Sequence, residues 1–182
     1  ETDVVVPDTM DDGVPVKRLG TQLLAGSETL TSVVVPDSVT ILDIGALSYD
    51  DNLSEITLSS NLINIGWNAI SSNDALTELT IPASVCIIDS YAVRGCYALK
   101  KIVFEGACPL IGSEAFAMLS DDVVIYVPDD QIEEYKKVFE ENNKDLNIQP
   151  SGKSAVLYSA EDYLDTENLT FDAETGSITG YN

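Results

Sequence analysis

Histidine is absent from this chain of 182 residues. Its absence removes the commonest general base, the Ser-His and Cys-His nucleophile pairs, and the usual ligands of catalytic zinc. The sequence also lacks a glycine-rich phosphate-binding loop and a G-x-S-x-G element. These absences argue against an enzyme, so we expect no catalytic residue, no cofactor and no metal centre.

Basic residues are scarce, with 9 Lys and Arg against 31 Asp and Glu, which gives a net charge of −22. Nucleic acid is excluded as a partner because binding phosphates requires clustered Lys and Arg. The acidic excess is typical of a soluble, exposed surface that resists self-association. Binding of a basic ligand or of divalent cations is the alternative interpretation. The acidic segment 8–13 resembles a calcium loop, but Met10 occupies a ligand position there, which favours a simple turn.

Long apolar runs and a disulfide framework are also missing. No apolar stretch approaches 18 residues, so we expect no membrane insertion. Three cysteines, an odd number, argue against a disulfide framework, and each is interpreted as a small buried hydrophobe. The length is that of one domain with a sizeable core. Because Glu1 lies inside a repeat-like segment, we expect the chain to be a processed or excised piece.

An internal repeat is the strongest positive signal in the chain. Leucine recurs every 23 residues and opens the same apolar pattern four times, followed by a degraded copy at Ile125 and Val127. The four copies are Leu30/Val33/Val35, Leu53/Ile56/Leu58, Leu76/Leu79/Ile81 and Leu99/Ile102/Phe104. A second apolar column consists of Leu19, Leu42, Ile65, Ile88 and Ile111. One such unit cannot bury its own apolar face, so the units are predicted to stack into a solenoid.

Each repeat is predicted to contain one short strand. The alternation of apolar and polar residues around Leu79 and Ile81 has the period of two that is typical of a half-buried strand. Pro82 then ends the strand, since it lacks an N–H and fixes φ. The segment 90–96 is interpreted as a helical or 3₁₀ turn. The fold class is therefore an α/β-type solenoid of about five coils over residues 1–128, with strands stacked in ladders.

Three segments carry a resemblance to a known family: PVKRLGTQLLAG at 15–26, the stretch from Leu76 to Gly106, and VVIYVPDD at 123–130. They resemble the 23-residue leucine-rich repeats of BspA-like bacterial surface proteins, over about residues 1–150. The resemblance implies an extracellular location on the bacterial cell surface. It also implies a non-enzymatic binding or adhesion module for a protein or glycan of a host or neighbouring cell. The alternative is a structural spacer in a tandem array, with no ligand of its own.

Residues 129–150 are predicted to close the solenoid with a capping helix and a turn. Asp129 or Asp130 can cap the helix N-terminus, and one apolar face follows from Ile132, Tyr135, Val138 and Phe139. Residues 151–182 are predicted to form a linker and a hairpin. This hairpin resembles the lead-in of a following repeat module.

The outward positions of the strands form the candidate ligand face. One column contains Val34, Thr57, Thr80, Val103 and Tyr126, and the neighbouring column contributes Glu55, Glu78 and Lys101. Apolar and aromatic side chains on a polar face favour an interface. Ordinary β-propensity on a half-exposed strand explains them equally well.

The two ends of the chain are predicted to interact. If residues 169–181 form a displaced hairpin, their edge is expected to pair with the strand around Val4–Val6, since unpaired edges recruit strands. Such pairing is possible within one molecule or, more readily, between molecules in head-to-tail self-association.

Overall fold

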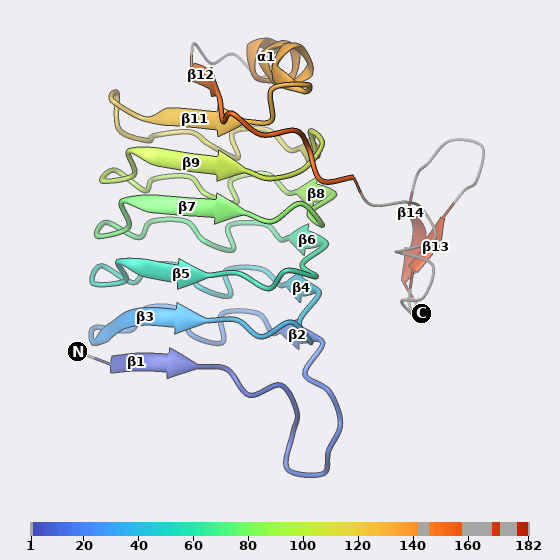
Figure 1. Ribbon diagram of the computed structural model, residues 1–182. Helices are drawn as coiled ribbons and strands as arrows, with labels where there is room; N and C mark the ends of the chain where they lie inside the picture. The colour runs from blue at the N-terminus through green and yellow to red at the C-terminus, as the bar shows by residue number, and fades with distance from the viewer. Residues whose placement is uncertain (1, 142–145, 158–168, 172–177, 182) are drawn as a thin grey trace.

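The computed structural model describes residues 2–141, 146–157, 169–171 and 178–181 (Figure 1). The chain winds as a parallel β-solenoid, in which each coil places one strand on the same side of the molecule. From the N-terminal end, these strands are β1 (Thr2–Val5), β3 (Leu30–Val34), β5 (Glu55–Thr57), β7 (Glu78–Ile81), β9 (Lys101–Phe104), β11 (Val124–Val127) and β12 (Asn147–Pro150). We call this side the strand face.

A second set of short strands lines another side of the solenoid. It consists of β2 (Arg18–Leu19), β4 (Ile41–Leu42), β6 (Asn64–Ile65), β8 (Ile87–Ile88) and β10 (Leu110–Ile111). Successive strands pair in parallel with a constant offset, so that Leu42 lies opposite Ile65 and Ile65 opposite Ile88. The predicted 23-residue register is therefore confirmed by the pairing itself.

The predicted apolar columns form most of the core. The four repeat leucines are at most 2% exposed, and Leu19, Leu42, Ile65 and Ile88 are completely buried, whereas Ile111, the last member of the second column, is half-buried. The alternation around Leu79 is also confirmed, because Leu79 and Ile81 are buried whereas Glu78 and Thr80 are exposed. A solenoid has no single central core, so each layer is stabilised by contacts with the layers above and below it.

The third side of the solenoid differs from the expected helical or 3₁₀ turn. In the coil of residues 43–48, Ala46 N–H donates to Asp43 and Ser48 N–H donates to Gly45, which makes two overlapping turns instead of a helical one. Two columns on this side have left-handed backbone, one containing Gly45 and Tyr91 and the other Tyr49 and Gly95. Backbone N–H groups here also donate to the next coil, as from Leu47 to Ala69. We call this side the turn face.

A helix closes the C-terminal end, as predicted. Helix α1 (Ile132–Glu141) buries Tyr135 and Phe139 against the last coils. The Phe139 ring lies 5.5 Å from that of Phe116, and the Tyr135 ring lies 4.9 Å from that of Phe104. The Tyr135 hydroxyl donates to the Gly106 and Ala107 carbonyls, each at 3.2 Å. The helix therefore covers an aromatic layer that would otherwise face water.

The chain continues beyond the helix as a further rung of the ladder. Strand β12 pairs in parallel with β11, so the segment that was expected to be a turn extends the sheet. In the segment where a hairpin was predicted, β13 (Leu169–Phe171) pairs antiparallel with β14 (Ile178–Tyr181). The expected turn around residue 174 lies outside the described residues. Among the described residues, β1 pairs with β3 and the strands β13 and β14 pair with each other, so the expected pairing with Val4–Val6 stays a prediction.

Candidate functional site

The strand face carries all eight residues of the predicted ligand face on its outer surface. Five of them are exposed: Val34, Thr57, Thr80, Glu55 and Glu78. The other three, Lys101, Val103 and Tyr126, point outward as predicted but are only half exposed. These three lie on β9 and β11, next to each other in the ladder, because Tyr126 pairs with Val103. Something other than the core covers this end of the face.

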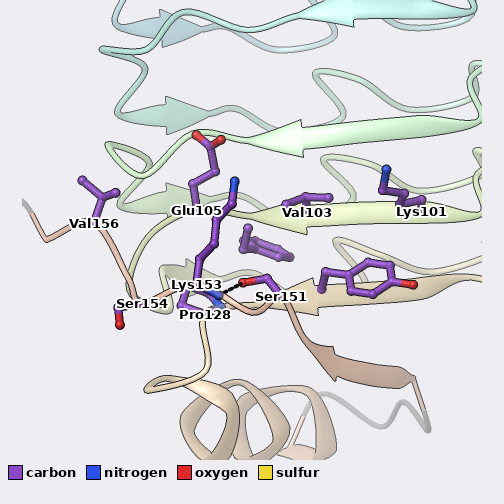
Figure 2. A pocket seen from close by; sticks show the side chains of 10 residues that line it. Lys101, Val103, Glu105, Pro128, Ser151, Lys153, Ser154 and Val156 are labelled. Atoms are coloured by element: carbon purple, nitrogen blue, oxygen red, sulfur yellow. Dashed lines mark hydrogen bonds between the residues drawn. The ribbon is translucent and has the colours of Figure 1, made fainter.

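These three residues line a pocket. It has a volume of about 330 Å³. Its lining combines the outer side of β9 and β11 with a segment that follows β12, and consists of Lys101, Val103, Phe104, Glu105, Tyr126, Pro128, Ser151, Lys153, Ser154 and Val156 (Figure 2). The volume of the pocket is within the range of small-ligand sites in proteins. The predicted face is therefore hollowed at its C-terminal end.

The outer wall of the pocket is residues 151–156, which we call the strap. The strap crosses back over the coils and is attached at several points by its backbone. Val156 N–H donates to the Glu105 carbonyl at 3.0 Å, and Ser151 N–H donates to the Val127 carbonyl at 2.8 Å. Each backbone bond of this kind contributes about 1 kcal/mol. The segment that the sequence assigned to a linker therefore forms part of the site.

Two aspartates complete the attachment of the strap. The Asp129 carboxylate accepts from Gly152 N–H, and the Asp130 carboxylate accepts from Ala155 N–H, each at 2.8 Å. The sequence predicted that one of these aspartates caps α1. They bind the strap instead, because the parallel pairing of β12 with β11 brings the chain after Pro150 back to this corner.

The charges of the pocket are unusual for so acidic a chain. Lys101 and Lys153, two of the nine basic residues, line it together with Glu105. Lys101 also pairs with Glu78 of the preceding coil, with 2.9 Å between Nζ and Oε2. Figure 2 shows the Lys153 side chain extending along the pocket toward Glu105. The site thus offers ammonium donors beside an aromatic ring and an apolar floor.

Three residues of the predicted ligand face, Lys101, Val103 and Tyr126, line the pocket. The other five lie outside it, on β3, β5 and β7: Val34, Glu55, Thr57, Glu78 and Thr80. The role of this face in binding stays a prediction. The lining residues that the sequence did not predict are Phe104, Glu105, Pro128 and the strap residues Ser151, Lys153, Ser154 and Val156. The 23-residue spacing is a signal that could have located the strap, because Asp129 accepts from Gly152 N–H, 23 residues later, just as Asp37 accepts from Ser60 N–H.

The cysteines do not provide a reactive group. All three are free, and Cys96 is buried. Burial raises the pKa of Cys96 to about 11 and that of Cys108 to about 12, with the negative charge of Glu134 adding to the second shift. A thiol with so high a pKa stays protonated at neutral pH and is a poor nucleophile. Within the described residues, no group of three or more acidic, cysteine or histidine side chains could hold a metal ion.

Stacked 23-residue coils with a leucine ladder define the chain as a leucine-rich-repeat solenoid. The model of the BspA-type leucine-rich repeat region matches residues 17–147 with six copies. The chain therefore belongs to the BspA-type leucine-rich-repeat family. The resemblance seen in the sequence is confirmed, and six copies replace the expected number of about five coils.

Solved structures of bacterial proteins share the fold. A leucine-rich repeat protein from Bacteroides capillosus is 36% identical, with a TM-score of 0.51 over 58% of this chain and 78% of that one. A leucine-rich cell surface protein from Faecalibacterium prausnitzii is 22% identical, with a TM-score of 0.53 over 90% of this chain and 34% of its own. The pneumococcal vaccine antigen PcpA is 17% identical, with a TM-score of 0.57 over 87% of this chain and 42% of its own.

Two of these neighbours are much longer than this chain. This chain spans less than half the length of the Faecalibacterium and pneumococcal proteins, and at their identities the similarity shows the fold alone. No curated protein matches the chain. In the described part of the chain, every helix is too short or too polar to cross a bilayer.

Proposed function

We propose that this chain is a non-enzymatic adhesion module of a bacterial cell surface that binds a protein or glycan ligand through its strand face. The pocket beneath the strap carries this proposal. It lies on the face that the sequence singled out, and it combines Tyr126, Val103 and two lysines in one concave site. The family membership and the two neighbours described as a cell surface protein and a vaccine antigen support the location.

The chemistry of the pocket suits the tip of a larger ligand. A tyrosine ring buries a large area at a small cost in side-chain entropy, which is why tyrosine is frequent among residues that dominate binding energy. Lys101 and Lys153 supply charged donors for carboxylate or hydroxyl groups of a ligand. Around the pocket, the exposed columns of β3, β5 and β7 extend the contact surface as a regular array.

A binding panel with matched variants tests this proposal. The purified chain is applied to immobilised collagen, fibronectin, laminin and mucin glycans, and its binding is measured by surface plasmon resonance. Tyr126→Ala removes the ring at the pocket floor, whereas Thr57→Ala removes an exposed group of the same face outside the pocket. We expect binding to at least one probe that Tyr126→Ala weakens by about tenfold or more and Thr57→Ala leaves unchanged.

The spacer role is the competing outcome of the same experiment. A spacer needs only a stable solenoid and no ligand, so the chain would bind none of the probes. Equal binding by Tyr126→Ala and Thr57→Ala would instead show that the ligand binds outside the pocket. Both results contradict the proposed site.

A further inference from the structure

Three aromatic side chains gather on the turn face, away from the outward positions of the strands. We call Tyr49, Trp67 and Tyr91 the aromatic cluster. Trp67 is the only tryptophan of the chain, and its side chain is 47% exposed. Tyr49 is 55% exposed, and Tyr91 is half-buried. Tryptophan and tyrosine at such exposure contribute little to the core, so the stability of the fold does not account for them.

Each ring of the cluster contacts a side chain of a neighbouring coil. The Tyr49 hydroxyl accepts a hydrogen bond from Asn68 Nδ2 at 3.1 Å. The Trp67 and Tyr91 rings meet edge to face, with 5.9 Å between their centroids and planes 79° apart. The Arg94 guanidinium lies 5.2 Å from the centre of the Tyr91 ring. The rings are therefore fixed in orientation although they face the solvent.

The backbone beneath the cluster is strained in a way that favours glycine. Tyr49 and Tyr91 have φ of 62° and 63°, in the left-handed region that bulky residues rarely adopt. The corresponding positions two coils away, Gly95 and Gly45, show that glycine fits both columns. A tyrosine in this conformation costs about 1 kcal/mol or more. The same conformation recurs at Asn68 and Ser72, so it belongs to the repeat, and the two tyrosines occupy positions at which glycine costs less.

We propose that the aromatic cluster is a binding site for neutral saccharides. The face of a pyranose ring presents C–H groups with partial positive charge, which are attracted to the negative face of an aromatic ring. Its edge presents hydroxyl groups, which need donors and acceptors. Asn68, Arg94 and Glu114 supply these at the rim of the cluster, with Arg94 Nε 3.9 Å from the Glu114 carboxylate.

Charge and size favour a saccharide over other partners. A chain with a net charge of −22 repels acidic polymers and acidic glycans, whereas a neutral saccharide experiences no such repulsion. A stable protein interface buries about 800 Å² on each partner around a desolvated centre. The cluster consists instead of three rings beside polar groups, a pattern that matches the apolar and hydroxyl surfaces of a sugar chain. This site goes beyond the proposed function, because it lies on a different face from the strap pocket.

The single tryptophan provides a direct measurement. Cellotetraose, chitotetraose and mannotetraose are titrated into the full chain while the intrinsic tryptophan fluorescence and its quenching by acrylamide are recorded. Stacking of a sugar on Trp67 is expected to shift the emission and to protect the ring from the quencher. A saturable change with at least one of the three sugars is the expected result. No change with any of them overturns the proposal.

Two variants separate binding from stability, and isothermal titration calorimetry measures their affinity. Trp67→Ala is expected to abolish binding, whereas Tyr126→Ala, in the strap pocket, is expected to bind the sugar like the unaltered chain. Tyr91→Gly relieves the left-handed strain, so it should melt at the same temperature or higher and yet bind at least about tenfold more weakly. Full binding by Trp67→Ala, or a strong drop in the melting temperature of Tyr91→Gly, contradicts the proposal. Loss of binding by Tyr126→Ala places the sugar in the strap pocket and also overturns it.

Discussion

The side chain of Asn73 accepts a hydrogen bond from the backbone N–H of Asp50, one coil away, at 3.0 Å. The two residues occupy the same position of successive repeats, and both are completely buried. Asn73 Nδ2 also donates to the Leu47 and Ile70 carbonyls, each at 2.8 Å. Asp50 accepts from Ser27 N–H through Oδ1, but its Oδ2 has no partner among the described residues. The amide of Asn73 therefore uses both its oxygen and its nitrogen in hydrogen bonds at this corner. At the same corner of the previous coil, the carboxylate of Asp50 uses only one of its two oxygens.

This difference predicts that Asp50→Asn stabilises the fold. The new amide could keep the bond to Ser27 and donate to the carbonyls of Leu24 and Leu47, which correspond to the partners of Asn73. We expect a gain of about 1–2 kcal/mol at pH 7, because a buried group without a partner becomes bonded. Chemical denaturation of the two proteins measures it. A loss of stability in the variant would contradict this account of the corner.

The gain should depend on pH. Burial raises the pKa of the Asp50 carboxyl above its ordinary value of 3.8. Its contribution to stability is therefore fully present below pH 3.8 and is lost as the pH rises through the folded pKa. The free energies of unfolding of the unaltered chain and of Asp50→Asn should therefore converge as the pH falls toward 3.8 and differ at higher pH. A difference independent of pH would show that the carboxyl does not titrate as described.

The second prediction tests the register of the ladder. Ile88→Asp places a charge among completely buried neighbours, and we expect it to cost more than about 3 kcal/mol or to prevent folding. Thr80→Asp introduces the same side chain on the exposed surface of β7 and should cost less than about 1 kcal/mol. Thermal melts of both variants provide the comparison. Equal shifts would contradict the assignment of inward and outward positions.

The third prediction concerns the contact between coils at a glycine. A Cβ atom on Gly66 would lie 2.5 Å from the Leu42 carbonyl oxygen of the preceding coil. Gly66→Ala must therefore separate the two coils, at a cost of about 1–3 kcal/mol. Gly20 occupies the same position of an earlier repeat, but a Cβ atom there would meet nothing within 4 Å, so Gly20→Ala should be neutral. Comparable destabilisation of the two variants would show that the close approach is not the cause.

The fourth prediction concerns self-association through the ends of the chain, which we propose to occur between molecules. Strand β1 pairs with β3 on one side, and Val5 is 72% exposed. Truncation after Leu157 removes the hairpin β13–β14 but keeps the strap, whose bonds end at Val156. Light scattering should show association that rises with concentration in the full chain and disappears in the truncated one. A full chain that stays monomeric at high concentration would contradict the proposal.

The ladder could be predicted from the sequence because each repeat leucine has one requirement, burial against identical neighbours. Leu53 and Leu76 recur at the same spacing for that reason, and the spacing alone sets the register. The turn face was harder to predict. Its left-handed positions are occupied by residues as different as Gly45, Asn68 and Tyr91, so no common residue type in the sequence indicates the conformation. Backbone bonds between coils impose it instead.

Only the strand residues of the candidate site could be predicted from the sequence, because they follow the period of the repeat. Tyr126 and Val103 follow from the period of the strand, which any copy of the repeat reveals. The strap lacks the apolar pattern of the repeat, although its first residues keep the 23-residue offset to the preceding coil. Its position depends on Asp129 and Asp130, whose carboxylates had an equally plausible use as helix caps, and only the three-dimensional course of the chain decides between the two uses.

Adhesion of coated particles tests the central claim most directly. Beads that carry the full chain, Tyr126→Ala or Thr57→Ala at equal density are applied to monolayers of human epithelial cells, and the attached beads are counted under flow. We expect the full chain and Thr57→Ala to attach equally and Tyr126→Ala to lose most of its attachment. Attachment of Tyr126→Ala at the level of the full chain, or no attachment above that of bare beads, would contradict an adhesion module that acts through the strap pocket.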